Sequence, residues 1–313
     1  MIALRHPDRV CEINFSLTSL IAGSIAEVVQ VPFLALKTIQ MKSKDVEEPP
    51  VLGDFLGGSA PLLERISLHG IAVPFPAIRR LLLSTSRLNT LTHVKIPNMC
   101  YFSPEDLVTC LSAFVHLKDL WVGFHSPASR PNPSMARPPS PERATLPSLI
   151  ALAFDSASEY LEEFVARIDC PVLATLGIKY FNQLIFEIPQ LVQFISRVDG
   201  LKSPSEVIVE PVTHSTMSLH RAGRGTRRRG KCYFRTPCRQ LDWKLSFLTQ
   251  ILQQLSPLLY SVHVLSIIKC SIPLIGKEDV DTTQWLELSN PSLKHRRFVF
   301  PLSNSYRMSC VRW

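Results

Sequence analysis

The sequence has 313 residues, of which 46% are hydrophobic and 19% are charged, a balance that excludes a disordered or collagen-like chain. The formal net charge is +8, and six of the positive charges lie between Arg221 and Lys231, with no acidic residue among them. The basic character is therefore local, and it does not predict that the whole protein binds nucleic acid.

In chain order, the sequence repeats a pattern of three apolar residues spaced as apolar-x-x-apolar-x-apolar. Such a pattern is typical of a short strand that hides alternate side chains. Its first positions recur at intervals of 24 to 32 residues. The seven triplets are Val10/Ile13/Phe15, Leu36/Ile39/Met41, Leu63/Ile66/Leu68, Leu91/Val94/Ile96, Leu117/Leu120/Val122, Leu149/Leu152/Phe154 and Leu173/Leu176/Ile178.

Several segments between and beyond the triplets predict helices. Residues 74–87 and 158–169 each carry apolar side chains at helical spacing. Ser103 is predicted to cap a helix whose first turn holds Pro104 and two acidic residues. Farther along, residues 241–255 predict an amphipathic helix, and residues 207–209 are compatible with a strand. Each repeat is therefore predicted to be a short strand followed by a helix.

This arrangement predicts an α/β fold of the leucine-rich-repeat type, a curved solenoid with parallel strands on its concave face and helices on its convex face. A unit this small cannot bury its apolar face alone, so neighbouring units must stack. The predicted organisation is a degenerate repeat array at 1–210 with a proline-rich surface insertion at 126–148, a basic disordered loop at 211–239, a continuation of the array at 240–290 and a divergent tail at 291–313.

Seven segments of the chain carry a resemblance to a known family. They are HPDRVCEI (6–13), FLGGSAPLL (55–63), GIAVPFPAIRRLLLS (70–84), SPEDLVTCLSAF (103–114), residues 158–197, PCRQLDWKLS (237–246) and TQWLEL (283–288). They resemble the F-box/leucine-rich-repeat proteins of mushroom-forming fungi, and the resemblance covers roughly residues 6–210 and 236–290. It implies a substrate receptor, in which an N-terminal F-box docks the adaptor of a cullin-RING ubiquitin ligase and the repeats hold the target.

The sequence departs from that family at the F-box. Nine residues precede the first triplet, and no Leu-Pro with a following hydrophobic helical pattern is present. Docking to the cullin-RING ligase adaptor is therefore not expected of this chain. The expected function is non-catalytic recognition of a protein target, and a truncated non-functional gene product remains an alternative.

The pattern of reactive residues predicts neither an enzyme nor a metal or cofactor site. The eight cysteines are scattered without metal-ligand spacing, and no phosphate loop, His-Glu-x-x-His or Gly-x-Ser-x-Gly motif is present. Free thiols in a reducing compartment are expected. The uncharged stretch at 13–26 is too short to cross a bilayer and lacks a clean signal cleavage site. We therefore expect no membrane association and a cytoplasmic or nuclear location.

A candidate binding surface follows from the strand register. With the triplets inward, the alternate residues must face outward on the concave side. A tryptophan among cations is typical of a binding hot spot, although a solvated face with the tryptophan packed against the 126–148 insertion is an alternative. The outward residues of the middle repeats are the most varied, and the predicted protein-binding set is Arg65, His69, His93, Lys95, Asp119 and Trp121.

The basic run offers a second candidate function. Its cations are Arg221, Arg224, Arg227, Arg228, Arg229 and Lys231. Such a run is compatible with a nuclear-import signal, with a weak, sequence-independent nucleic-acid contact, or with a solvated charge run. The aromatic residues nearest to it, Tyr233 and Phe234, are too few for a base-stacking platform.

Overall fold

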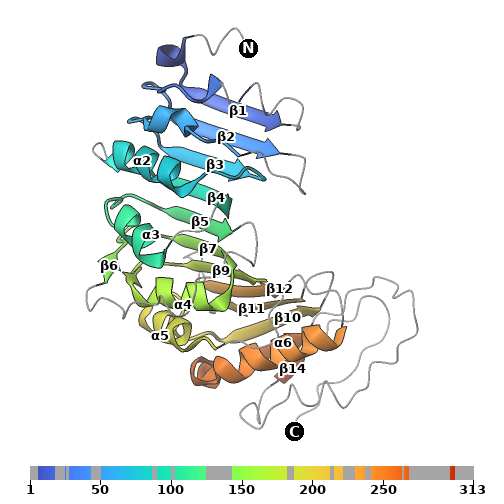
Figure 1. Ribbon diagram of the computed structural model, residues 1–313. Coiled ribbons are helices and arrows are strands. Elements are labelled where there is room, and N and C mark those ends of the chain that lie inside the picture. The colour runs from blue at the N-terminus through green and yellow to red at the C-terminus, as the bar shows by residue number, and fades with distance from the viewer. Residues whose placement is uncertain are drawn as a thin grey trace. The chain divides into compact units, whose positions relative to one another are not determined.

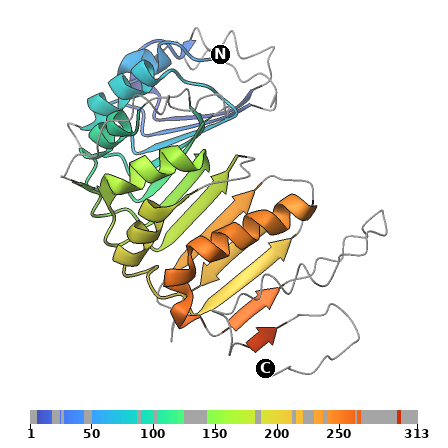
Figure 2. The same cartoon turned by 60° about the horizontal axis from the view of Figure 1, so that its bottom comes forward.

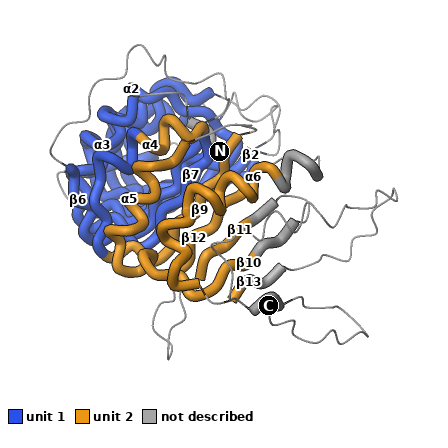
Figure 3. The backbone as a smooth tube through the Cα atoms, turned by 90° about the horizontal axis from the view of Figure 1, so that it is seen from below, with its two compact units in different colours: residues 1–156, 163–171 blue, residues 157–162, 172–313 orange. Residues whose placement is uncertain are grey.

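The computed structural model describes residues 6–17, 25, 28–43, 51–86, 90–99, 103–124, 143–181, 187–211, 215–220, 230–236, 241–262, 264–267 and 297–299. Over these residues the protein is mixed α/β, with a large, mostly parallel sheet and helices (Figure 1). The chain forms two compact units, coloured separately in Figure 3. Unit 1 is Met1–Ser156 with Glu163–Pro171, and unit 2 is Ala157–Glu162 with Val172–Trp313.

The main sheet of unit 1 is parallel, and its strands follow one another in the sheet in chain order. The register aligns the predicted triplets, because their second positions, from Ile13 through Ile66 to Leu152, are partners from strand to strand. The strands that carry these triplets therefore form one parallel ladder within unit 1. The strands are β1 (Glu12–Leu17), β2 (Thr38–Ser43), β3 (Arg65–His69), β4 (His93–Met99), β5 (Asp119–Phe124) and β7 (Ala151–Ser156).

The triplet side chains form the core beneath these strands. The first positions Leu63, Leu91, Leu117 and Leu149 are completely buried just before β3, β4, β5 and β7. In the first triplet Val10 and Phe15 are only half-buried, whereas Ile13 is buried. Full burial of one such side chain contributes about 1.5–3 kcal/mol, so the repeated triplets are the main source of stability of this sheet.

Helices α2 (Phe75–Ser86) and α3 (Pro104–Leu111) lie against one face of this sheet (Figure 1). The predicted cap of α3 is confirmed, because Ser103 Oγ accepts a hydrogen bond from the Asp106 N–H at 3.1 Å. Shorter elements complete unit 1. They are the 3-10 helices η2 (Pro7–Arg9) and η3 (Phe55–Gly58) and a two-stranded parallel pair, β6 (Ala144–Thr145) with β8 (Ile168–Asp169).

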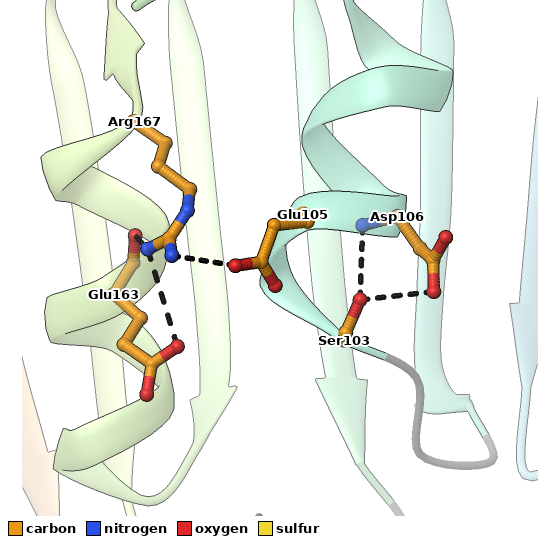
Figure 4. Close-up of polar contacts among 5 residues, drawn as sticks. All are labelled: Ser103, Glu105, Asp106, Glu163 and Arg167. Carbon is orange, nitrogen blue, oxygen red and sulfur yellow. Dashed lines mark hydrogen bonds and ion pairs between the residues drawn. The ribbon is translucent and has the colours of Figure 1, made fainter. Parts of the chain in front are cut away.

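A buried arginine ties α3 to the end of helix α4 (Ser158–Ala166), whose last residues belong to unit 1 (Figure 4). The Arg167 side chain is 4% exposed, and its Nη2 lies 2.6 Å from Glu105 Oε1. Its Nη1 donates to the backbone carbonyl of Glu163 at 2.9 Å and lies 3.9 Å from the Glu163 carboxylate. The guanidinium therefore caps the last turn of α4, and the Glu105 carboxylate neutralises its charge.

The strands of unit 2 form a sheet in the order β9-β12-β11-β10-β13-β14. The aromatic ring of Tyr180, a buried residue of β9, makes an edge contact with Phe247 of helix α6, which lies along one face of this sheet (Figure 2). The elements are β9 (Thr175–Tyr180), α5 (Pro189–Arg197), β10 (Glu206–Pro211), β11 (Ser215–His220), β12 (Lys231–Thr236), α6 (Leu241–Gln254), η5 (Ser256–Ser261), β13 (Val264–Ile267) and β14 (Arg297–Val299).

The structure corrects the predicted disordered loop at 211–239. Strands β11 and β12 lie within it and pair antiparallel, and β12 is also the parallel partner of β9. These strands form because every second side chain is apolar and buried. Met217 and Leu219 of β11 are the ladder partners of Phe234 and Cys232 of β12. Strand β14 likewise lies inside the predicted divergent tail, and the predicted strand at 207–209 and helix at 241–255 correspond to β10 and α6.

A carboxylate of α4 holds the first turn of α5 within unit 2. Glu162 Oε2 accepts from the Gln190 N–H at 2.6 Å, and Oε1 accepts from the Leu191 N–H at 2.9 Å. Burial raises the pKa of Glu162 to about 7, although these two hydrogen bonds act in the opposite direction. The nearby Glu187 carboxylate adds a smaller upward contribution to the same pKa. A helix start is therefore held by a group that titrates near neutrality.

We expect the Glu162→Gln variant to change the pH dependence of stability. In the unfolded chain Glu162 loses its proton near its ordinary pKa of 4.5, whereas the folded protein keeps the proton until about pH 7. The stability from the protonated group is therefore complete below pH 4.5 and is lost as the pH rises to about 7. Urea midpoints measured from pH 4 to 8 should fall more steeply for the wild type than for Glu162→Gln. Parallel profiles would contradict the assignment.

Candidate functional site

The structure brings all six predicted surface residues onto three neighbouring strands of unit 1. Arg65, His93 and Asp119 are successive ladder partners across β3, β4 and β5. Lys95 is the partner of Trp121, and His69 ends β3. The side chains alternate with the buried triplets, so they project from the face opposite to the core. We call these six residues the strand-face patch.

His93 is held between two oxygen atoms. Its Nε2 lies 2.8 Å from Asp119 Oδ2, and its Nδ1 lies 2.7 Å from Thr92 Oγ1. Burial lowers the pKa of His93, and this effect and the surrounding cations outweigh the opposite effect of Asp119. The ring is therefore mainly neutral at pH 7, with Nε2–H donating to the carboxylate. Both ring nitrogens therefore have polar partners, a carboxylate at Nε2 and a hydroxyl at Nδ1.

His69 and Trp121 meet across the strand between them. Their ring centroids are 5.3 Å apart with an interplanar angle of 75°, an edge-to-face arrangement. Trp121 is half-buried, and its Nε1 is buried with no hydrogen-bond partner among the described residues. The contact fixes the indole over the sheet, where it presents a rigid apolar area.

The patch lies in a positive local potential. The pKa of His69 is lowered most by burial and next by the nearby cations of Lys42 and Lys95. Burial lowers the pKa of His93 most, and Asp119 raises it. The cations of Arg65, Lys95 and Lys118 then add smaller downward contributions. The carboxylate of Asp119 is already bonded to His93. The arrangement therefore favours a partner that combines an apolar contact with negative charge.

Three residues that act on the patch, Lys42, Thr92 and Lys118, were not in the predicted set. Lys42 is the ladder partner of His69, and its outward position on β2 follows from the triplet register. Thr92 precedes the outward positions of β4, and its hydroxyl also lies 3.0 Å from the carbonyl oxygen of Glu64. No local sequence signal marks Thr92, because its role depends on the neighbouring strand.

The basic run is described only at its end. Residues 221–229, which include Arg221, Arg224, Arg227, Arg228 and Arg229, lie outside the described residues. Lys231 begins β12, so this cation belongs to the sheet and not to a loop. The run thus connects two antiparallel strands of unit 2.

The described residues also bear on metal binding, membrane spanning and thiol chemistry. They contain no group of three or more His, Cys, Asp or Glu side chains that could hold a metal ion. Their described helices include none that is long and apolar enough to cross a membrane. Of the cysteines in this part of the chain, Cys110, Cys170 and Cys232 are buried thiols and Cys11 is an exposed thiol.

No protein-family model matches the chain, and no curated protein is significantly similar to it.

Proposed function

We propose that this chain is a non-catalytic recognition protein, a leucine-rich-repeat solenoid that binds a protein partner through the strand-face patch. The observation that carries the proposal is the in-register pairing of β1 to β5 and β7, which places their outward side chains side by side. Repeat proteins use such extended surfaces for binding.

The resemblance to F-box/leucine-rich-repeat proteins supports the same proposal. It implies the part of a ubiquitin-ligase receptor that holds the substrate. The edge contact of Trp121 with His69, beside the cation of Lys95, has the composition of a hot spot, in which a rigid aromatic anchor is surrounded by polar groups. The partner would contact the patch with an apolar side chain and a flanking acidic group.

The test compares the wild type with Trp121→Ala and Lys95→Ala. Proteins captured by each are quantified by mass spectrometry, and the affinity of the most depleted protein is then measured directly. We expect Trp121→Ala to weaken that affinity by about 30-fold, which corresponds to a hot-spot loss of about 2 kcal/mol. Lys95→Ala should weaken it by less, because an exposed ion pair contributes little.

The matched control is Arg79→Ala, which removes an exposed cation from α2 in the same unit. It should leave capture unchanged. Circular dichroism establishes that each variant is folded. Equal capture by wild type, Trp121→Ala and Lys95→Ala would reject the strand-face patch as the binding surface.

A further inference from the structure

Three neighbouring strands of unit 2 carry charge of a single sign. The sequences of β9, β12 and β11 contain no acidic residue. Their outward cations are Lys179 on β9 and Lys231 and Arg235 on β12. Arg235 is the ladder partner of Lys179, so these two cations lie on adjacent strands, whose separation is about 4.8 Å.

A tyrosine lies at the centre of these cations. Tyr233 is the ladder partner of Gly177, and its ring occupies the space that a Cβ atom at residue 177 would take. The ring therefore leans onto the backbone of β9, which only glycine permits there. Lys231 Nζ lies over the ring at 5.6 Å from its centroid, and Arg235 Cζ lies over it at 6.0 Å.

The two cations of β12 are organised but not neutralised. Among the described residues, no carboxylate forms an ion pair with Lys231 or Arg235, and both side chains are exposed. Cation–π attraction holds both heads near one ring, although like charges repel each other. A bound anion would remove that repulsion, and no rearrangement of the ring would be needed.

We propose that Lys179, Lys231, Tyr233 and Arg235, here called the tyrosine–cation cluster, bind an acidic polypeptide segment in extended conformation. Lys231 and Arg235 are four residues apart on a strand, a separation of about 13 Å along it. Residues four apart in an extended peptide have the same spacing, so two glutamates separated by three residues meet both cations. Lys179 provides a third charge beside Arg235.

Single-stranded nucleic acid fits this cluster less well. Sequence-independent binding of single strands relies on bases stacking against aromatic rings. At Tyr233 the ring rests on Gly177, and the cationic heads lie over it. The proposal concerns unit 2 alone and does not depend on the strand-face patch of unit 1.

The test uses a fluorescein-labelled peptide of alternating glutamate and threonine, and the full-length chain. Fluorescence anisotropy gives its affinity for the wild type, for Lys231→Gln/Arg235→Gln and for the control Arg197→Gln/Lys202→Gln. The control removes the same charge from exposed positions elsewhere in unit 2. We expect the cluster variant to bind at least about tenfold more weakly and the control less than about twofold, since charge-assisted contacts to both cations are lost only in the cluster variant.

Two further arms separate the cluster from general charge attraction. Tyr233→Leu keeps both cations but removes the ring that positions them, and it should weaken binding severalfold. A peptide with glutamine in place of glutamate should not bind. The variant Lys42→Gln/Lys95→Gln of unit 1 is measured alongside. The proposal would be overturned if the glutamate peptide did not bind, if the cluster and control variants lost affinity equally, or if only this unit 1 variant lost affinity. Tighter binding of a 12-nucleotide single strand, abolished by the same cluster variant, would overturn it in favour of nucleic acid.

Discussion

Replacing Glu105 with alanine is expected to lower the free energy of unfolding by about 3 kcal/mol, because the variant leaves a buried guanidinium without its shortest partner. The Arg167 side chain is 4% exposed, and Glu105 supplies its 2.6 Å contact. The remaining Glu163 carboxylate lies at 3.9 Å and does not replace that contact. Glu105 itself is 40% exposed, which places the expected loss at the lower end of the range for broken buried pairs. Urea denaturation followed by circular dichroism measures it.

The control for this prediction is the same change in an Arg167→Met background. Methionine removes the charge and keeps apolar packing, so Glu105 then has no buried cation to compensate. In that background Glu105→Ala should cost less than about 0.5 kcal/mol, the usual range for a surface substitution. An equal cost in both backgrounds would show that the ion pair does not stabilise unit 1.

Replacing Phe154 with alanine is expected to destabilise unit 1 by about 3–5 kcal/mol. Phe154 is completely buried as the third residue of its triplet on β7. Its ring stacks on Phe164 of α4 at 6.4 Å between centroids and meets Phe124 of β5 edge-on at 6.3 Å. The substitution therefore opens a cavity where sheet and helix meet, and neighbouring aromatic rings cannot collapse into it without breaking their own contacts.

The matched control is Val115→Ala, since Val115 is 41% exposed in the same unit. It should change the free energy of unfolding by less than about 0.5 kcal/mol. Denaturant titration of both variants compares them directly. A Phe154→Ala loss as small as that of the control would mean that the triplet positions do not form the core.

The repeated part of the fold is predictable from sequence because its signals are local. A triplet such as Leu63/Ile66/Leu68 predicts which face of its strand is buried. The recurrence of the triplet predicts that the strand of the previous repeat is its neighbour in the sheet. The start of α3 is predictable for the same reason, since Ser103 and Pro104 act within one helical turn.

The β11–β12 hairpin depends on pairing that no local signal reveals. Its buried residues, such as Met217 and Phe234, alternate over only a few positions and flank an arginine- and glycine-rich run. Their partners are set by an antiparallel turn and by β9, which lies much earlier in the chain. Composition therefore favoured disorder where tertiary pairing forms strands.

The candidate site was predictable in position but not in its contacts. The register placed His93 and Asp119 on adjacent strands, whereas the 2.8 Å bond between them depends on their rotamers. The His69–Trp121 contact joins strands that are not neighbours, and only the reach of the indole allows it. Burial of Arg167 was also unexpected, because charged side chains are seldom buried without a partner, and Glu105 is distant in sequence.

The insertion of β11 and β12 between β9 and β10 affects the order of events during synthesis. In unit 1 a strand pairs with its predecessor soon after it emerges, as for Thr38 and Arg65, 65 − 38 = 27 residues apart. Strand β9 must wait for β12, because Thr175 pairs with Lys231, 231 − 175 = 56 residues later. Pairing at such separation slows folding, and until β12 arrives β9 lacks its partner at that edge. Nascent chains arrested between these points should therefore bind chaperones more strongly than those arrested within unit 1.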